Sequence, residues 1–546
     1  MQDSVPPRPE RRRRLRMIMP AFPTFNIYSD IARVTTALGP VIVATAVHEV
    51  EGWDVEVIDE NNYRKSGPRN HAGMPDHETL QRLRPADVVG FYGGLTSTIP
   101  RLYELARFYR ERGVPTLAGG QHFVDENIAE ALQNAVDIVV QGEGEEAIKD
   151  LLHHFDGRLT REKISGLAYL ENGQVVKTPA RKLLTDFHRN PLPDFSLVRY
   201  AKIIIYPVAR VRGCGMDCEF CTVKGKARYG TPEYLLEQIS SLFETYGARQ
   251  FFIVDDLFGQ DRMETLRLCN LLRDYQQNVK VRFRITVQIR LDKGKDAELL
   301  KAMREAGIQI VAIGFESPIP EELKAMDKRL KPEDMITLSR QYSKAGFFIH
   351  GMFIFGYPLP EGVEFHMTAK DRVRAFRKFI KKARIDTIQV LLPVPVPGTE
   401  LTQRLRQQNR IFSKEYIGWQ YYDGNFPLFV PDAPLTPENM QASNQKIMGR
   451  FYRFRYMFHV GLDILAFPFI IFYLHDLERG WRRWNRSWRN NLTKFEGWLI
   501  LRRWIARFAQ DSFSKNLAGA KRQIALAWNN GIFQKNLASP GRNPGA

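Results

Sequence analysis

Three of the four cysteines of this chain lie within eight residues of one another. Cys214, Cys218 and Cys221 follow a C-x3-C-x2-C spacing in the segment Gly213–Cys221. Three soft thiolates so closely spaced can bind three corners of a cubic [4Fe–4S] cluster, which leaves the fourth iron without a protein ligand. A reactive metal site requires such an open coordination position.

A structural zinc site is the main alternative for these cysteines, and three unrelated buried thiols are another. Zinc would need a fourth Cys or His nearby, whereas Cys269 lies 48 residues beyond Cys221 in a helix-like stretch, Met263–Leu272. We therefore expect Cys269 to be a core residue. So few cysteines in a chain of 546 residues also disfavour a disulfide-stabilised secreted protein, and the chain is expected to be cytoplasmic.

The cysteine segment follows the first strand of a repeating strand–helix pattern. The spacing predicts strands at Ile203–Val211, Gln250–Val254, Val281–Thr286, Gln309–Gly314, Phe348–Phe355 and Asp386–Leu392. Successive βα units of this length build a parallel, curved sheet. Six of them predict a partial (βα)6 barrel of the TIM type in place of the complete eight-fold one.

A second strand–helix alternation occupies residues 14–150. Strands are predicted at Leu15–Met19, Asp54–Ile58, Val88–Tyr92, Thr116–Ala118 and Ile138–Val140. This alternation predicts a Rossmann-like parallel sheet with helices on both faces, whose ligands bind at the carboxyl ends of its strands. Three of those ends are rich in glycine, namely Gly93–Thr98, Gly119–His122 and Gly142–Glu145, which indicates a large, flat or phosphate-bearing ligand, although any one loop could be a simple tight turn.

The fold class is therefore α/β, with four regions along the chain. Residues 14–160 form the Rossmann-like domain, and residues 161–199 form a hairpin and a linker, with the hairpin turn at Asn172-Gly173. Residues 200–400 form the partial barrel, and residues 401–546 form a helical C-terminal region.

These motifs resemble the radical SAM superfamily, in the branch that carries an N-terminal cobalamin-binding domain. The resemblance covers about residues 14–400 and includes strand motifs at Phe252–Phe258, Gly314–Ser317, Gly351–Pro358 and Pro393–Thr399. It implies that Cys214, Cys218 and Cys221 bind a [4Fe–4S] cluster and that S-adenosylmethionine (SAM) chelates the open iron. Reductive cleavage of SAM then gives a 5′-deoxyadenosyl radical, which abstracts hydrogen from an unactivated carbon.

The same resemblance implies which residues bind the cofactors. Phe220, Arg284, Gln288, Glu316 and Ser317 are expected around SAM, and no residue is assigned a catalytic role. Cobalamin contacts are expected from Thr96, Ser97, Gly119, Gly120, His122, Gly142, Glu143 and Gly144. The DxHxxG motif that supplies a lower cobalt ligand elsewhere is absent, because Asp59–Tyr63 stands in its place. No lower ligand is therefore assigned, and a domain that has lost its cobalamin is the alternative.

The net charge of +18, from 79 basic and 61 acidic residues, is concentrated at the chain ends. Residues 475–546 carry 14 basic and 4 acidic residues and six of the eight tryptophans, and they follow the apolar run Val460–Leu474. That run is too short to span a bilayer, so the composition indicates an amphipathic anchor on a membrane surface. A helical cap on the barrel and a nucleic-acid site are the alternatives, and the near-neutral body disfavours nucleic acid.

The sequence therefore predicts a cobalamin-dependent radical SAM enzyme, peripheral on the inner face of the membrane, that methylates a hydrophobic or lipid-like substrate. Its reductant would be an external electron donor such as flavodoxin or ferredoxin. The architecture is similar to that of the anaerobic magnesium-protoporphyrin monomethyl ester cyclases and the hopanoid methylases. A radical oxidative cyclase or another C–C bond-forming enzyme is the second hypothesis, and a non-catalytic sensor that binds the cluster and cobalamin is the third.

Overall fold

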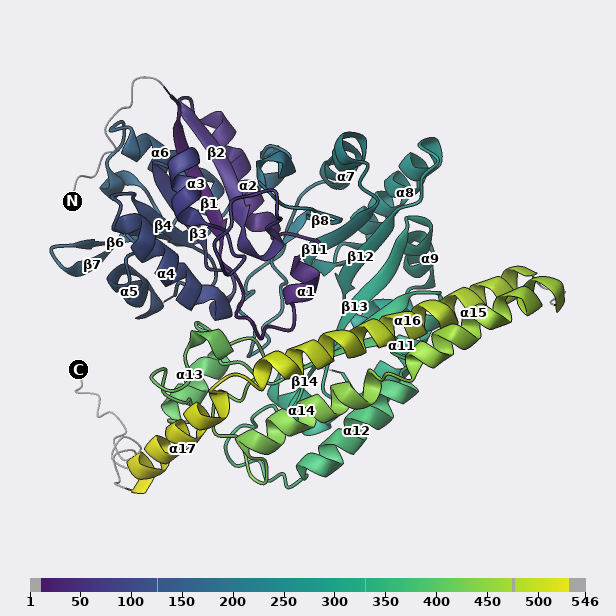
Figure 1. Ribbon diagram of the computed structural model, residues 1–546. Coiled ribbons are helices and arrows are strands. Elements are labelled where there is room, and N and C mark those ends of the chain that lie inside the picture. The colour runs from purple at the N-terminus through teal and green to yellow at the C-terminus, as the bar shows by residue number, and fades with distance from the viewer. Residues whose placement is uncertain (1–10, 125, 329, 474–476, 530–546) are drawn as a thin grey trace, which may run out of the picture.

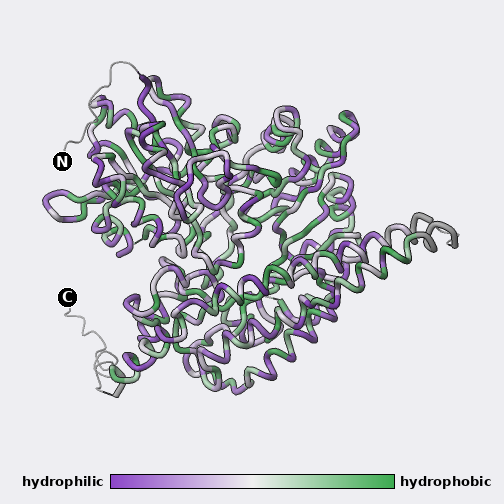
Figure 2. The backbone as a smooth tube through the Cα atoms, viewed as in Figure 1, coloured by the Kyte–Doolittle hydropathy of each residue, from purple (hydrophilic) through white to green (hydrophobic). Residues whose placement is uncertain are grey.

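Two mainly parallel sheets stand side by side, and the helices from residue 400 onward lie beneath them (Figure 1). The computed structural model describes residues 11–529 apart from 125, 329 and 474–476. Hydrophobic and hydrophilic residues alternate along the helices that cover the sheets (Figure 2), as helices with one face in a core and one in solvent require.

The first sheet is doubly wound, as predicted. In the described residues its parallel strands run in the order β2-β1-β3-β4-β5. Their bounds are β1 (Arg13–Met19), β2 (Trp53–Asp59), β3 (Val88–Tyr92), β4 (Thr116–Gly119) and β5 (Ile138–Val140). One face is covered by α2 (Leu38–Ala46) and α6 (Glu145–Phe155), and the other by α3 (His77–Leu83), α4 (Ile99–Arg110) and α5 (Glu126–Gln133). The strand order reverses between β1 and β3, which is where such sheets bind ligands.

The arginine-rich start of the chain is built into this sheet. Each of four arginines pairs with a carboxylate: Arg11 with Asp87, Arg13 with Asp156, Arg14 with Asp54 and Arg16 with Glu56, at 2.7 to 2.9 Å. Arg16 and Glu56 are both fully buried. The charges of these four arginines are therefore neutralised by carboxylates within the fold.

The predicted hairpin extends the first sheet. Strands β6 (Leu167–Glu171) and β7 (Gln174–Lys177) are joined by a turn in which Asn172 and Gly173 both have positive φ, and β6 pairs antiparallel with β5. Positive φ at both central residues is the geometry of a two-residue hairpin turn. The hairpin thus belongs to the first sheet, whereas the sequence grouped it with the linker.

The second sheet has six parallel strands in chain order, as predicted for a partial barrel. Its strands are β8 (Ile205–Val208), β11 (Gln250–Phe258), β12 (Arg284–Ile289), β13 (Ile308–Glu316), β14 (Phe348–Ile354) and β15 (Thr387–Leu391). Between them lie α7 (Pro232–Tyr246), α8 (Arg262–Asn278), α9 (Ala297–Glu305), α10 (Pro320–Ala325), α11 (Pro332–Lys344) and α12 (Ala369–Lys382). A small ladder of β9 (Val211–Arg212) and β10 (Arg228–Tyr229) brackets the cysteine segment.

Local sequence signals define where these helices begin and end. In α7, the Thr231 hydroxyl accepts from the Tyr234 N–H, Pro232 occupies the first turn, and Gly247 ends the helix with a φ of 64°. Thr and Pro are favoured at a helix start, and glycine is favoured in the left-handed conformation just beyond its end.

The C-terminal region is helical, as predicted, and part of it caps the barrel. Its helices are α13 (Glu400–Gln407), α14 (Pro437–Phe451), α15 (Tyr456–Tyr473), α16 (Leu477–Phe508) and α17 (Phe513–Asn529). Arg486 of α16 donates to the Ser343 carbonyl at 2.9 Å, Asn490 donates to Asp386 at 2.9 Å, and Trp504 is buried. In the described part of the chain, no helix is long and apolar enough to cross a membrane.

Candidate active site at the junction of the two sheets

The three clustered cysteines lie in one loop between β9 and β10. Cys218 is buried, while Cys214 and Cys221 are partly exposed. Burial raises the pKa of the Cys214 thiol, and repulsion from Cys221 and Cys218 raises it further. The three thiols are therefore within electrostatic range of one another. The Val223 N–H points at the Cys221 sulfur at 3.4 Å, a contact that stabilises a thiolate ligand.

Two neighbouring carboxylates on β11 hold the chain that enters this loop. Asp255 accepts from the N–H groups of Arg210 and Val211 at 2.7 and 2.9 Å, and Asp256 accepts from the Gly213 N–H at 2.6 Å. Burial raises the pKa of Asp255 to about 6. These bonds draw the chain out of the sheet after Val208, so the predicted strand Ile203–Val211 is split into β8 and β9.

A second anchor fixes the middle of the cysteine loop. Glu219 accepts from Arg404 of α13 at 2.6 and 3.0 Å and from the Tyr357 hydroxyl at 2.5 Å. Phe220 packs against the Tyr357 ring at a centroid distance of 6.0 Å. The sequence motifs drew attention to Phe220 but gave no sign that Arg404, 185 residues away from Glu219, completes the loop.

Glu316, predicted to face SAM, forms an ion pair inside the barrel. Its carboxylate lies 3.0 Å from the Lys328 ammonium, and both side chains are largely buried. Burial alone would lower the Lys328 pKa, but the charges of Glu316 and Cys218 outweigh it and raise that pKa. Glu316 has a φ of 58°, a left-handed conformation that is uncommon for a residue with a side chain and is often found at functional sites. Lys328 could not be predicted as part of the site, because it lies in a loop without a motif.

Two other residues predicted around SAM lie elsewhere. Arg284 is the first residue of β12, so it stands at the amino end of the barrel, whereas the cysteine loop follows the carboxyl ends. Ser317 is fully buried, and its hydroxyl donates to Glu322, away from the barrel interior. Gln288 remains on the inner, exposed side of β12 near its carboxyl end, and Arg290 just beyond it contacts the Met216 sulfur at 3.0 Å.

The physical reason for the wrong placement of Arg284 is strand register. The predicted strand Val281–Thr286 begins three residues too early, because β12 spans Arg284–Ile289. Arg284 instead lines a cavity of about 1200 Å³ between the amino end of the barrel and α16, together with Arg304, Arg486 and Trp488.

Glycines allow two loops of the first sheet to pack backbone against backbone. Gly120 has a φ of 128°, and a Cβ there would lie 2.5 Å from the Gly93 carbonyl carbon. The Gly93 N–H donates to Gly119 at 2.7 Å. Thr96 and Ser97 follow in a buried turn (η3, Thr96–Thr98). Any larger residue at position 120 would push the loops apart, so the predicted cobalamin loops are held together by close glycine packing.

His122 is part of the packed interior of this junction. It is 1% exposed, its ring meets Trp419 at 4.8 Å and Phe123 at 5.4 Å, and its Nδ1 lies 3.3 Å from the Thr96 hydroxyl. Burial lowers the pKa of His122 to about 3. Its Nε2 is buried without a partner in the described residues. Trp419 from the C-terminal region covers one side of the ring, and the corrin contact of His122 stays a prediction.

The Gly142–Gly144 loop joins the two domains. Glu143 lies 2.9 Å from both Arg212 and Arg228, the two arginines of the β9–β10 ladder, and it accepts from the Leu184 N–H at 2.8 Å. Arg212 also pairs with Glu145. Both Glu143 oxygens are thus engaged by protein groups that join the two domains, and its cobalamin contact stays a prediction.

The two sets of loops meet directly. The Thr222 hydroxyl, one residue beyond Cys221, donates to Gln121 at 3.1 Å, and Gln121 follows Gly119 and Gly120. The carboxyl ends of both sheets therefore border one junction. A crevice of about 230 Å³ opens at the strand reversal of the first sheet and is lined by Met19, Tyr28, Asp59, Tyr92 and Leu95 among others, at the place where such sheets bind ligands.

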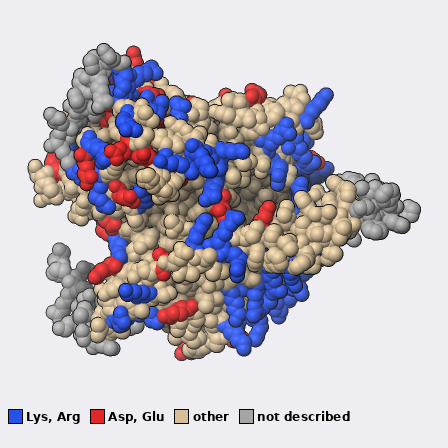
Figure 3. All heavy atoms as spheres, in the orientation of Figure 1, with Lys and Arg blue, Asp and Glu red and all other residues tan. Residues whose placement is uncertain are grey.

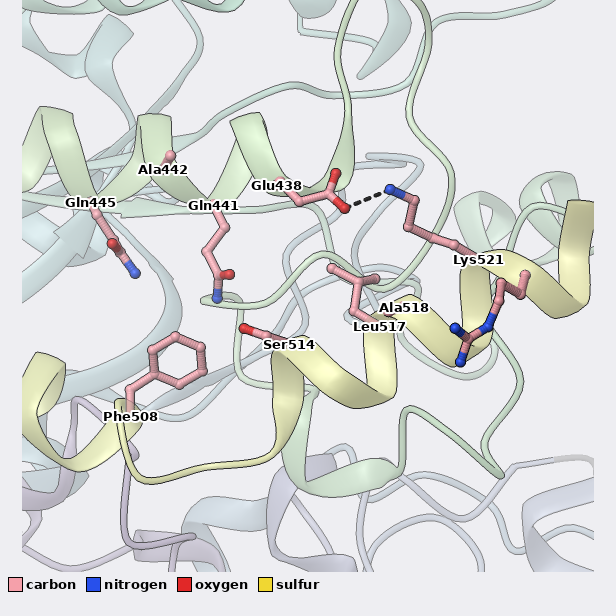
Figure 4. Close-up of a pocket in the computed structure, with 10 residues that line it drawn as sticks. Glu438, Gln441, Ala442, Gln445, Phe508, Ser514, Leu517, Ala518 and Lys521 are labelled. Carbon is pink, nitrogen blue, oxygen red and sulfur yellow. Dashed lines mark hydrogen bonds and ion pairs between the residues drawn. The ribbon is translucent and has the colours of Figure 1, made fainter.

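A separate groove lies far along the C-terminal region. It measures about 470 Å³ between α14 and α17, and the Glu438–Lys521 ion pair closes one side (Figure 4). No side chain of the cysteine loop or of the first sheet lines it, so this groove is not part of the junction.

The cysteine loop has the donor chemistry of a [4Fe–4S] site. Within the part of the chain that the structure describes, no three His, Cys, Asp or Glu side chains gather closely enough to hold a single metal ion. A cubic cluster makes a different demand, because each cysteine binds a separate iron and the sulfurs need not meet at one point. Cys269 is buried alone in α8, where burial raises its pKa to about 12.

Comparison with protein families agrees with this arrangement. The Radical SAM superfamily profile matches residues 208–389, and the B12 binding domain profile matches residues 28–152. The first range begins at the end of β8 and ends within β15, and the second spans the helices and strands that carry the glycine loops.

Several curated proteins are similar to this chain. An uncharacterised methyltransferase of Pyrococcus horikoshii is 28% identical over 72% of this chain and 84% of its own length. Hopanoid C-2 methylase of Rhodopseudomonas palustris is 25% identical over 71% of this chain and 67% of its own length. The anaerobic magnesium-protoporphyrin IX monomethyl ester cyclase of Cereibacter sphaeroides is 24% identical over 59% of this chain, which spans about half (52%) of that protein.

Among solved structures, the cobalamin-dependent S-adenosylmethionine radical enzyme OxsB with aqua-cobalamin bound has a TM-score of 0.59 at 14% identity. The match covers 94% of this chain and 84% of that one. At this identity the likeness shows a shared fold, which includes the C-terminal helices as well as the two sheets.

The partial barrel, its cysteine loop and the adjoining doubly wound sheet define the class of this protein. The chain is a radical SAM superfamily enzyme with an N-terminal B12-binding domain. Its cofactors are a [4Fe–4S] cluster, SAM and cobalamin, as these two domains imply.

Proposed function

We propose that this enzyme transfers a methyl group to an unactivated carbon of a hydrophobic or lipid-like substrate. The observation that carries the proposal is the direct contact between the two sets of cofactor loops, through Thr222 and Gln121. When bound, the cluster and SAM supply a carbon-centred radical and cobalamin supplies a methyl group. Methyl transfer requires both chemistries at one substrate carbon, and loops that touch can serve one bound substrate.

In this proposal Cys214, Cys218 and Cys221 hold the cluster, and the groups around them position SAM. Glu316 and Lys328 offer one negative and one positive group beside the cysteines. These charges match the α-ammonium and the α-carboxylate of an amino acid, so SAM would exchange the protein ion pair for two of its own. Phe220 offers a flat apolar surface for the adenine.

The substrate class rests on two supports. The crevice at the first sheet is lined mostly by apolar side chains, including Met19, Phe22 and Leu95, which favour apolar groups. Relatives are named for a hopanoid and for a magnesium protoporphyrin ester. The proposal includes an external one-electron donor such as flavodoxin or ferredoxin.

The test is anaerobic reconstitution with iron, sulfide and cobalamin, followed by SAM and a reductant. We expect 5′-deoxyadenosine from the wild type and from Cys269→Ala, and none from Cys218→Ala. With substrate extracts added, S-adenosylhomocysteine formed alongside 5′-deoxyadenosine is expected for methyl transfer. If 5′-deoxyadenosine and a cyclised or newly C–C-bonded product form without S-adenosylhomocysteine, the enzyme is an oxidative cyclase or C–C bond-forming enzyme and the methyl-transfer proposal fails.

A further inference from the structure

Helix α12 presents a face of exposed cations to solvent. Its 14 residues contain seven basic residues and one acidic residue. Val373, Phe376, Phe379 and Ile380 are buried on the side that faces the barrel. Arg372 is buried as well and pairs with Glu322, and the other six basic residues of the helix are exposed. The exposed cations of the patch are Lys370, Arg374, Arg377, Lys378, Lys381, Lys382 and, just after the helix, Arg384.

Nothing in the described chain neutralises most of this charge. Arg374 pairs with Asp371 at 3.1 Å, and no carboxylate among the described residues is within ion-pair distance of Arg377, Lys378 or Lys381. Besides burial, the charges of Arg450, in the last turn of α14, and of Arg453, just beyond that helix, lower the Arg377 pKa. Cations from two helices thus gather at one place, where their mutual repulsion favours an anionic partner.

The apolar arm begins where this patch ends. We use that name for the hairpin of α15 and α16, which projects from the body of the molecule (Figure 1). Large apolar side chains of its α15 side are exposed: Met457, Phe458, Leu462, Ile464 and Leu465, with Phe458 60% and Leu465 70% exposed. Trp481 on the α16 side is 46% exposed. Such a run of exposed apolar residues marks an interaction surface.

Figure 3 shows the two features next to each other, with Lys and Arg side chains gathered below the arm over α12, and uncharged residues along the arm. Only four residues, Tyr452, Arg453, Phe454 and Arg455, separate the end of α14 from the start of α15. The patch and the arm therefore form one continuous surface.

We propose that the α12 patch and the apolar arm together dock on an anionic lipid bilayer. Exposed cations bind anionic headgroups, and aliphatic and tryptophan side chains enter the interface without a helix that spans it. A single-stranded nucleic acid would use the cations and aromatic rings but would gain nothing from exposed Leu462, Ile464 and Leu465. The proposal goes beyond methyl transfer and does not depend on it.

The experiment is flotation of the full chain with vesicles of phosphatidylcholine alone or mixed with phosphatidylserine. We expect binding to the mixed vesicles, weakened by salt, and little binding to phosphatidylcholine. The triple variant Arg377→Gln, Lys378→Gln, Lys381→Gln should weaken binding by roughly 100-fold, at about fivefold for each cation. The matched control Lys65→Gln, Lys177→Gln, Lys182→Gln removes three exposed cations of the first domain and should bind as the wild type does.

A second triple variant, Phe458→Ser, Leu462→Ser, Leu465→Ser, separates the apolar contribution. It should retain only weak binding that salt abolishes completely. Thermal unfolding and 5′-deoxyadenosine formation by each variant show that its fold is intact. The proposal is overturned if both triple variants float as the wild type does. It is equally overturned if the wild type stays unbound while the cations bind single-stranded RNA, or if the arm serves only to pair two copies of the chain.

Discussion

The junction of the two sheets and the outer face of α12 carry charge in opposite ways. At the junction, Glu219, Glu143 and Glu316 lie 2.6, 2.9 and 3.0 Å from Arg404, Arg212 and Lys328. On α12, a cluster of exposed cations shares one neighbouring carboxylate, Asp371. The ion pairs at the junction join segments that are distant in the chain and fix the positions of the loops around the site. Unmatched charges contribute no such link, so the fold does not need them.

The largest effect should come from the cysteine loop. We expect Cys218→Ala to abolish the absorbance of the [4Fe–4S] cluster and to leave far less than four irons per chain after reconstitution. The buried Cys269→Ala is the control, and it should retain the full iron content at some loss of stability. Iron analysis and visible absorbance measure both. Equal iron in the two variants would contradict the assignment of the cluster to this loop.

Asp59 is an exception at the junction, because it is buried without a cation. Burial raises its pKa to about 6, despite hydrogen bonds from Thr36 and Asn61. The unfolded chain loses this proton near pH 4 and the folded chain near pH 6, so stability present below pH 4 is lost as the pH rises through 6. The free energy of unfolding should fall by on the order of 3 kcal/mol over this pH range. Asp59→Asn should abolish this pH dependence.

Urea unfolding at a series of pH values measures this dependence. Asp54→Asn is the control of opposite sign, because burial raises the Asp54 pKa but the bonds from Arg14 outweigh it and lower that pKa. The contribution of Asp54 to the free energy of unfolding is present above its unfolded pKa and is lost as the pH falls through its lower folded pKa. If Asp59→Asn retains the wild-type slope between pH 4 and 6, this reading of Asp59 is wrong.

Removal of one partner from a matched pair should cost an intermediate amount. Arg404→Met leaves Glu219 half-buried without its cation, and we expect the free energy of unfolding to fall by about 1–3 kcal/mol. The cysteine loop should also load less iron. Arg374→Met, which breaks the exposed pair with Asp371, should change the stability by less than about 0.5 kcal/mol. If Arg404→Met and Arg374→Met lower the free energy of unfolding by similar amounts, the ion pairs at the junction stabilise the fold no more than the exposed pair on α12 does.

The smallest effect on the fold should come from the unmatched cations. Neutralising Arg377, Lys378 and Lys381 together should leave the free energy of unfolding within about 0.5 kcal/mol of wild type or raise it slightly, because like charges repel. Urea unfolding in low salt is the sensitive measurement. A clear loss of stability would show that these cations have partners within the fold.

The positions of most strands along the chain and the cysteine loop could be predicted from the sequence, because both depend on local patterns. Val88–Tyr92 and Ile138–Val140 were predicted with the bounds that the structure has. Arg284 was misplaced because an apolar strand pattern fixes which residues are inside but leaves its start free by a few residues. A shift of three residues moved that side chain from one end of the barrel to the other.

The partners of the site could not be predicted, because they come from distant segments. The residues around Glu143 in the sequence do not indicate that its ion-pair partner is Arg212, and those around Glu316 do not indicate Lys328. The cationic surface of α12 could not be predicted from the charge distribution for another reason. An average over the middle of the chain is nearly neutral, yet the fold pairs most of those charges and leaves the cations of α12 on the surface. Whether a cation can bind a partner depends on its position in the folded protein, which the composition does not reveal.

The contacts of Trp419 with the first domain can form only late in synthesis of the chain. Its ring covers His122, and its N–H donates to Glu130 at 2.6 Å across 289 residues of chain. At about 5–20 residues per second, a ribosome needs roughly 15–60 s to make that stretch. The first sheet can therefore fold before Trp419 is synthesised and before its contacts with His122 and Glu130 can form.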